Sequence, residues 1–120
     1  ERQSLAAISL TNPSTITAIG NDYGFENIFS RQCESLVVRN DIAIGISTSG
    51  NSLNVINGIK QSKKNKAITI GISGNSGGKL KKFCDFNIIV PSTSTPRIQE
   101  VHRVVIHIIC DLVERSFKKI

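Results

Sequence analysis

The chain lacks methionine and tryptophan, and Tyr23 is its single tyrosine among 120 residues. Its formal charge of +6 comes largely from lysines, and these are not interleaved with the aromatic side chains on which bases stack. No apolar run is long and uncharged enough to span a bilayer. These absences predict a protein whose partners include neither nucleic acid nor a membrane.

Cysteine is scarce and forms no recognisable motif. Cys33, Cys84 and Cys110 are widely spaced, and no CxxC pair is present. An odd number of unpaired cysteines in apolar surroundings predicts reduced thiols in the core of a cytoplasmic protein. The length of 120 residues suits a single domain with one hydrophobic core.

Four short apolar runs, at residues 5–10, 41–46, 67–72 and 86–90, predict strands. Each is continuous rather than alternating, which is typical of a parallel sheet covered on both faces. Helical patterns are expected at residues 25–36, 53–63, 78–84 and 97–118. This alternation predicts an α/β fold, an open parallel sheet flanked by helices.

The segment 45–52 carries the strongest indication of function. It leads from a buried strand through a turn rich in glycine and hydroxyl groups into a helix. Backbone N–H groups and the positive end of a helix dipole meet at such a turn, and phosphate binds there. The segment has neither a P-loop lysine nor dinucleotide-binding spacing. We therefore expect a phosphate on a small hydroxylated ligand; the alternative is an ordinary turn capped by Ser49 or Ser52.

A second turn, at residues 71–78, resembles the first and also follows a strand. Two interpretations stay open for it, a second anion site and a flexible turn that its four glycines permit.

The last helix is expected to be mostly buried, because its apolar positions are Ile98, Val101, Val104, Val105, Ile108, Ile109, Leu112 and Val113. His102 falls among these positions and is expected to be a packing residue. His107 instead shares a polar stripe with Gln99, at 100° per residue. An imidazole there could act as a general acid or base, or be a structural residue at a subunit contact.

Three motifs in one order, at residues 21–25, 45–52 and 97–102 with His107, resemble the phosphoheptose isomerase family of the sugar isomerase (SIS) superfamily. The resemblance implies a SIS-type, Rossmann- or flavodoxin-like partial domain over residues 1–120. It further implies that the N-terminal portion of the family pattern is missing, with its catalytic glutamate and two zinc ligands. A polypeptide that truly began at Glu1 would then not be expected to catalyse the reaction.

The resemblance implies an enzyme that interconverts sedoheptulose 7-phosphate and D-glycero-D-manno-heptose 7-phosphate for lipopolysaccharide or another surface glycan. The residues implied to bind the sugar phosphate are Ser47, Thr48, Ser49, Ser52, Asn21, Asp22 and Gln99. Gln99 and His107 are implied as ligands of one zinc ion per subunit, and His107 also as an acid/base. Family members are cytoplasmic homotetramers with active sites at subunit interfaces.

The spacing of Gln99 and His107 limits how they could share a metal. Eight residues span about 12 Å along a helix, whereas zinc–ligand distances are about 2 Å. We therefore expect the helix to begin after Gln99, or the ligands to come from different subunits. Two other functions stay open, a non-catalytic SIS paralogue that binds a protein such as a replication initiator, and an isomerase of another sugar phosphate.

Overall fold

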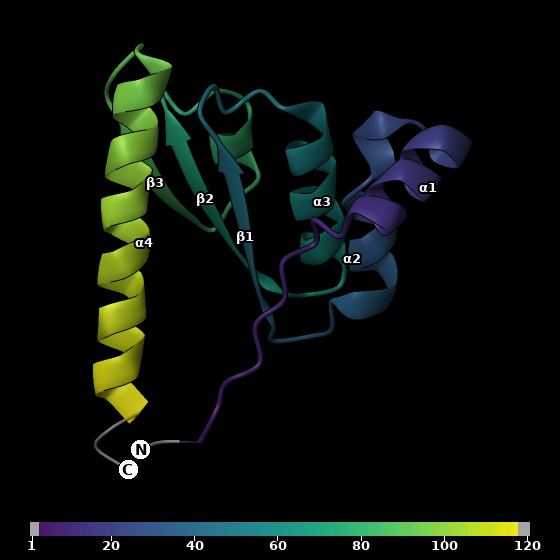
Figure 1. Ribbon diagram of the computed structural model, residues 1–120, viewed down its shortest axis with the longest axis horizontal. Helices are drawn as coiled ribbons and strands as arrows, with labels where there is room; N and C mark the ends of the chain where they lie inside the picture. Colours follow the sequence, from purple (N-terminus) through teal and green to yellow (C-terminus); the bar gives the residue numbers. More distant parts are fainter. Residues whose placement is uncertain (1–2, 118–120) are drawn as a thin grey trace.

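The computed structural model describes residues 3–117 and has the expected α/β architecture (Figure 1). In chain order the elements are α1 (Pro13–Tyr23), η1 (Phe25–Asn27), α2 (Ser30–Leu36), β1 (Ile42–Ser47), α3 (Leu53–Lys64), β2 (Ile68–Gly74), η2 (Leu80–Lys82), β3 (Phe86–Val90) and α4 (Thr95–Phe117). Here η denotes a short 3₁₀ helix.

Within the described residues, β1, β2 and β3 form one parallel sheet in that order. Ile42 pairs with Ile68 at one end of β1, and Ser47 pairs with Ser73 at the other. The carboxyl ends of the strands therefore meet at one edge of the sheet, so the turns that follow β1 and β2 lie beside each other.

One face of the sheet packs on α3. A Cβ atom on Gly45 would lie 2.8 Å from Cγ1 of Ile59, so the glycine lets the helix approach the strand closely. Ile56, Ile59 and Leu80 form the buried cluster between these layers. The helix expected at residues 53–63 agrees with α3 to within one residue at its end.

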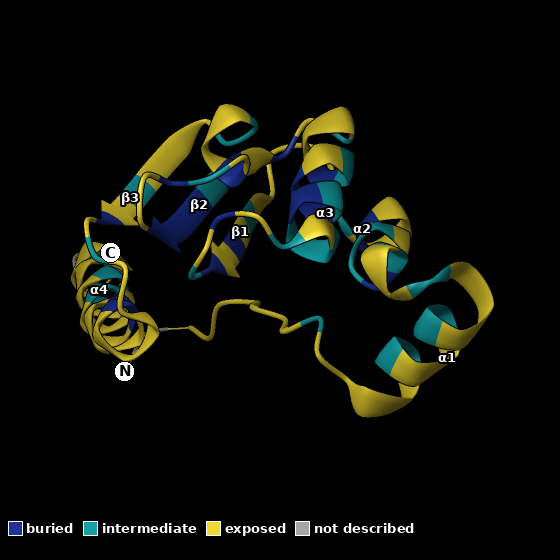
Figure 2. Cartoon of the chain, turned by 90° about the horizontal axis from the view of Figure 1, so that it is seen from above, coloured by how far each residue is buried: buried dark blue, intermediate teal, exposed yellow. Residues whose placement is uncertain are grey.

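The opposite face carries α4 (Figure 2). Ile98 and His102 are the buried residues of this helix, and His102 Nε2 donates a hydrogen bond to the Ser73 carbonyl oxygen over 3.0 Å. The packing role predicted for His102 is confirmed. The prediction of a mostly buried helix is wrong for a single chain, because the other apolar side chains of α4 are exposed or half-buried.

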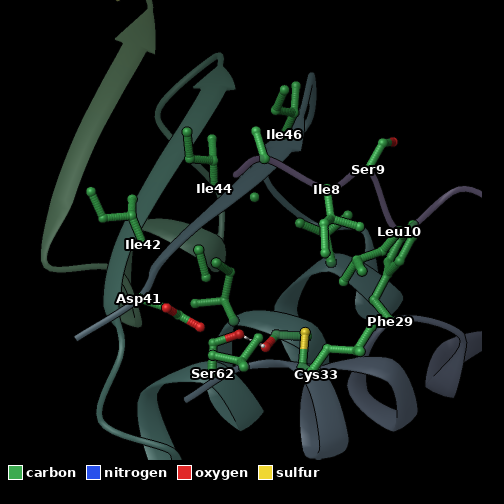
Figure 3. Close-up of a pocket in the computed structure, with 18 of the residues that line it drawn as sticks. Ile8, Ser9, Leu10, Phe29, Cys33, Asp41, Ile42, Ile44, Ile46 and Ser62 are labelled. Atoms are coloured by element: carbon green, nitrogen blue, oxygen red, sulfur yellow. Dashed lines mark hydrogen bonds between the residues drawn. The ribbon is translucent and has the colours of Figure 1, made fainter. Parts of the chain in front are cut away.

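The predicted strand at residues 5–10 is wrong. This segment is extended but carries no strand or helix, and it passes β1 without pairing (Figures 1 and 2). Within the described residues β1 pairs only with β2, and the segment forms no backbone ladder with the free edge of β1. Strands form only where backbone groups find partners. An apolar cavity of about 770 Å³ separates residues 6–11 from β1 (Figure 3).

The helices also differ from the prediction in three places. Helix α1 was missed, although Pro13 begins it and Asn12 caps it by accepting a hydrogen bond from the Thr15 amide (3.2 Å). The helix expected at 25–36 is divided into η1 and α2. The one expected at 78–84 is reduced to the single 3₁₀ turn η2, in a segment whose preceding glycines disfavour a helix.

The three cysteines lie in different surroundings. Cys33 is buried, Cys84 is half-buried and Cys110 is exposed, so the prediction of core thiols is confirmed for Cys33 and wrong for Cys110. Burial raises the pKa of the Cys33 thiol, and a hydrogen bond with Ser62 partly offsets this. Among residues 3–117, no helix is both long and apolar enough to cross a membrane.

Candidate functional site

The turn between β1 and α3 gathers the predicted phosphate-binding hydroxyl groups. Ser47 ends the strand, Ser52 is the N-cap residue of α3, and their Oγ atoms lie 2.9 Å apart. Ser49 Oγ accepts a hydrogen bond from the Asn51 amide (3.1 Å). The hydroxyl of Ser52 makes no capping bond to the helix. The Val55 amide donates to Asn54 Oδ1 over 2.8 Å, so the amides of Leu53 and Asn54 are the first-turn donors left to an external acceptor. We call residues 47–52 the cradle.

The second glycine-rich turn packs directly against the cradle. Gly50 has a φ of +66°, and a Cβ atom there would lie 2.2 Å from the Gly77 carbonyl oxygen. The Leu80 amide donates to the Gly50 carbonyl (2.8 Å), and the Lys79 amide donates to Asn51 Oδ1 (3.0 Å). The two amides that directly follow this turn therefore hold the cradle. This favours a supporting role for residues 71–78 over a second anion site.

Asn21 and Asp22 lie near the end of α1, and both are exposed. Asn21 Nδ2 donates to Asp22 Oδ1 over 2.9 Å, and no hydrogen bond within the described residues joins either side chain to the cradle. The chain continues from them into η1, which contacts α3. The structure thus brings the segment after this pair, rather than the pair itself, to the cradle's helix.

Gln99 and His107 are both exposed on α4, on the opposite face of the sheet from α3 (Figure 2). Helix α4 runs without a break from Thr95 to Phe117, so the alternative in which the helix begins after Gln99 is wrong. Within residues 3–117, His107 makes no hydrogen bond to the cradle. One chain therefore does not assemble all of the predicted site residues.

The residues of one chain do not complete a zinc site. A structural or catalytic zinc ion takes three or four protein ligands, and Gln99 and His107 could supply at most two. Among the described residues, no group of three His, Cys, Asp or Glu side chains could hold a metal ion. Further ligands would have to come from a second copy or from outside residues 3–117.

A groove beside the cradle was not predicted from the sequence. It has a volume of about 340 Å³ and lies between η1 and the first turn of α3, lined by Phe25, Glu26, Ser52, Leu53 and Asn54. Of the described residues in this lining, Glu26 alone carries a carboxylate. The sequence offered one indication, because Glu26 directly follows the motif at residues 21–25.

The larger cavity between residues 6–11 and β1 has a different character. Figure 3 shows Ile8, Leu10, Ile42, Ile44 and Ile46 around it. Among the described residues, Asp41 is the only charged residue of its lining, and the lining on β1 stops before Ser47. The hydroxyl groups of the cradle therefore do not line this cavity.

Comparisons with known proteins agree with the fold and with the motifs. Residues 16–104 match the SIS domain family. A phosphoheptose isomerase of Helicobacter pylori is 53% identical over 118 residues, covering 98% of this chain and 62% of that relative.

Two solved structures are also similar. A phosphoheptose isomerase from Neisseria gonorrhoeae superposes with a TM-score of 0.89 at 43% identity, over 92% of this chain and 62% of its own. One from Francisella tularensis has a TM-score of 0.91 at 37% identity, over 95% of this chain and 62% of its own. The chain therefore spans about three fifths of the length of the relatives that it matches.

Proposed function

The chain belongs to the SIS domain family, and we propose that its protein is a phosphoheptose isomerase. The reaction would interconvert sedoheptulose 7-phosphate and D-glycero-D-manno-heptose 7-phosphate, as a step toward heptose for lipopolysaccharide or another surface glycan. The observation that carries this proposal is the cradle, where Ser47, Ser52 and the start of α3 converge. The similarity to phosphoheptose isomerases over nearly the whole chain supports it.

Aldose–ketose isomerisation moves a proton between adjacent carbons, so it needs an acid/base pair and a clamp on the remote phosphate. We propose that Ser47, Thr48, Ser49 and Ser52 hold the phosphate. Asn21, Asp22 and Gln99 would contact the sugar. His107 would transfer the proton, since an imidazole can act as a general acid or base.

The site would be completed by other copies of the chain. α3 and α4 lie on opposite faces of the sheet (Figure 2), so His107 would face the cradle of a neighbouring subunit. The exposed apolar stripe of α4, formed by Val101, Val104, Ile108 and Leu112, borders the polar stripe that carries His107. Both features support an assembly of several copies with active sites at its interfaces, and we propose that it is a cytoplasmic homotetramer.

We further propose that Gln99 of one subunit and His107 of another contribute to a zinc site, because the unbroken α4 keeps these two residues of one chain about 12 Å apart. Its remaining ligands would lie outside the described part of this chain. Histidine nitrogen is a common zinc ligand. When bound, the ion would act as a Lewis acid on the sugar.

The test is to incubate the full-length protein with sedoheptulose 7-phosphate and to follow the aldose product by NMR. We expect turnover, a loss of at least about 100-fold in kcat for His107→Ala, and a lower zinc content in that variant. Arg115→Gln, a change at an exposed residue of the same helix, is the matched control and should leave both unchanged. No turnover with or without zinc would refute the isomerase, and full activity of His107→Ala would refute the role of His107.

A further inference from the structure

We propose that Glu26 determines specificity at this site by accepting hydrogen bonds from the hydroxyl groups of the sugar whose phosphate occupies the cradle. This inference rests on the proposed function and adds a residue to it. The juxtaposition that carries it is the groove whose lining Glu26 and Ser52 of the cradle share.

The groove continues directly from the cradle. Ser52 lines both, since it is the N-cap residue of α3 and one of the five residues around the groove. A ligand that places its phosphate against Ser52 therefore has the groove beside it. Phe25 and Leu53 are 63% and 57% exposed, and their apolar surfaces can pack against the C–H groups of a sugar.

The backbone holds Glu26 in place beside α3. Asn57 Nδ2, on the second turn of α3, donates to the Glu26 carbonyl oxygen over 3.1 Å. Gly24 has a φ of +88°, and a Cβ atom there would lie 2.7 Å from Glu26 Oε1. The carboxylate thus lies over the α-carbon of Gly24.

The carboxylate is available to a ligand. Within residues 3–117 its oxygens make no hydrogen bond or ion pair. An ionised carboxylate only accepts hydrogen bonds, so it suits the hydroxyl groups of a sugar and repels a phosphate. This assigns the hydroxyl end of the ligand to Glu26 and the phosphate end to the cradle.

A purely structural role makes a different prediction. The first turn of α3 contains no acidic residue, so Glu26 could instead stabilise the helix through its dipole. Its replacement would then lower the melting temperature and would weaken all ligands of the cradle alike.

The experiment compares Glu26→Gln with the wild-type full-length protein, using sedoheptulose 7-phosphate and inorganic phosphate as separate ligands in calorimetric titrations. Hydrogen bonds to charged groups contribute enough that we expect the Kd for sedoheptulose 7-phosphate to rise about tenfold or more. The Kd for inorganic phosphate should stay the same or fall slightly, because a nearby negative charge is removed. Glu34→Gln, at an exposed carboxylate on α2, is the control and should leave both values unchanged.

An equal change in both Kd values, or none for the sugar phosphate, would overturn the role of Glu26. The outcome is separate from that of the proposed function. A wild-type protein that binds sedoheptulose 7-phosphate without turnover, while Glu26→Gln shows the expected split, refutes the isomerase and supports Glu26 as a sugar-binding residue. Normal turnover with no split refutes Glu26 alone.

Discussion

At the scale of single residues, the Ser52 hydroxyl is expected to contribute more to phosphate binding than to the stability of the fold. Serine at an N-cap position usually stabilises its helix through a side-chain hydrogen bond, but the Ser52 hydroxyl instead bonds Ser47 Oγ at 2.9 Å. The helix therefore depends little on this hydroxyl group, and its O–H can donate to an anion when Ser47 is the donor of the bond between them.

Ser52→Ala should accordingly raise the KM for sedoheptulose 7-phosphate about tenfold, with kcat changed much less, because a phosphate grip acts on ground and transition states alike. The free energy of unfolding should fall by less than about 1 kcal/mol. Steady-state kinetics and urea titrations measure the two effects, with Ser35→Ala on α2 as the control. An unchanged KM would mean that the phosphate binds elsewhere.

The cradle also shows how one residue can depend on a distant segment. Gly50 lies against Gly77 and Gly78, and a Cβ atom at Gly50 would overlap the Gly77 backbone. The sequence shows that both turns are rich in glycine, but not that they pack on each other. Residues 71–78 are needed to shape the cradle even if they contact no ligand.

At the scale of elements, α4 presents two different faces. Ile98 and His102 face the sheet, whereas Val104, Ile108 and Leu112 are each more than half exposed. Fully burying a side chain of this kind contributes about 1.5–3 kcal/mol relative to leaving it in water. Such a stripe is larger than scattered surface apolar residues and is typical of an interface.

Leu112→Glu should therefore dissociate the proposed homotetramer without unfolding the chain, because Leu112 is 57% exposed in a single copy. Sedimentation velocity should show a smaller species, while circular dichroism retains its helical signal. Arg103→Gln, on the polar side of the same helix, should leave the assembly intact. A tetramer that persisted in Leu112→Glu would place the interface on another surface.

The failed strand prediction at residues 5–10 also belongs to this scale. Its composition favours a strand, but a strand exists only as part of a sheet. The described residues include no strand between this segment and β1, and an apolar cavity separates them. The local preference is therefore not realised in residues 3–117.

At the scale of the whole molecule, Asp85 connects three elements at the amino end of the sheet. Its carboxylate accepts hydrogen bonds from Lys63 Nζ at the end of α3, and from the amide and hydroxyl of Thr69 on β2. The Lys63 bond, followed by the two from Thr69, lowers the pKa of Asp85 to about 2. Because Asp85 directly precedes β3, these bonds join α3, β2 and β3.

A lowered pKa means that the unfolded chain binds the proton more readily, so this group stabilises the fold above the ordinary aspartate pKa of about 4. That contribution should be lost as the pH falls from about 4 toward about 2. Asp85→Asn should consequently lower the melting temperature at pH 7, and its deficit should shrink across this window. Thermal unfolding followed at several pH values tests this. The control is Asp111→Asn, which removes the carboxylate of an exposed ion pair with Arg115. A deficit that did not vary with pH would show that the charge of Asp85 is unimportant.

The sequence by itself determined the α/β class, strands β1, β2 and β3, helix α3 and the position of the cradle. These features depend on local pattern, since apolar runs, hydroxyl groups and glycines follow one another along the chain. The burial of His102 was also predictable, because helical periodicity alone places it among apolar positions.

Only the tertiary structure decided which segments meet. It placed Glu26 beside Ser52 and packed the two glycine-rich turns together. It also left the apolar stripe of α4 exposed and residues 5–10 without a partner strand. Each of these outcomes depends on residues far apart in the chain or on groups outside it. Local preference is set by neighbouring residues, whereas pairing, burial and the completion of a site are set by whatever surface lies opposite.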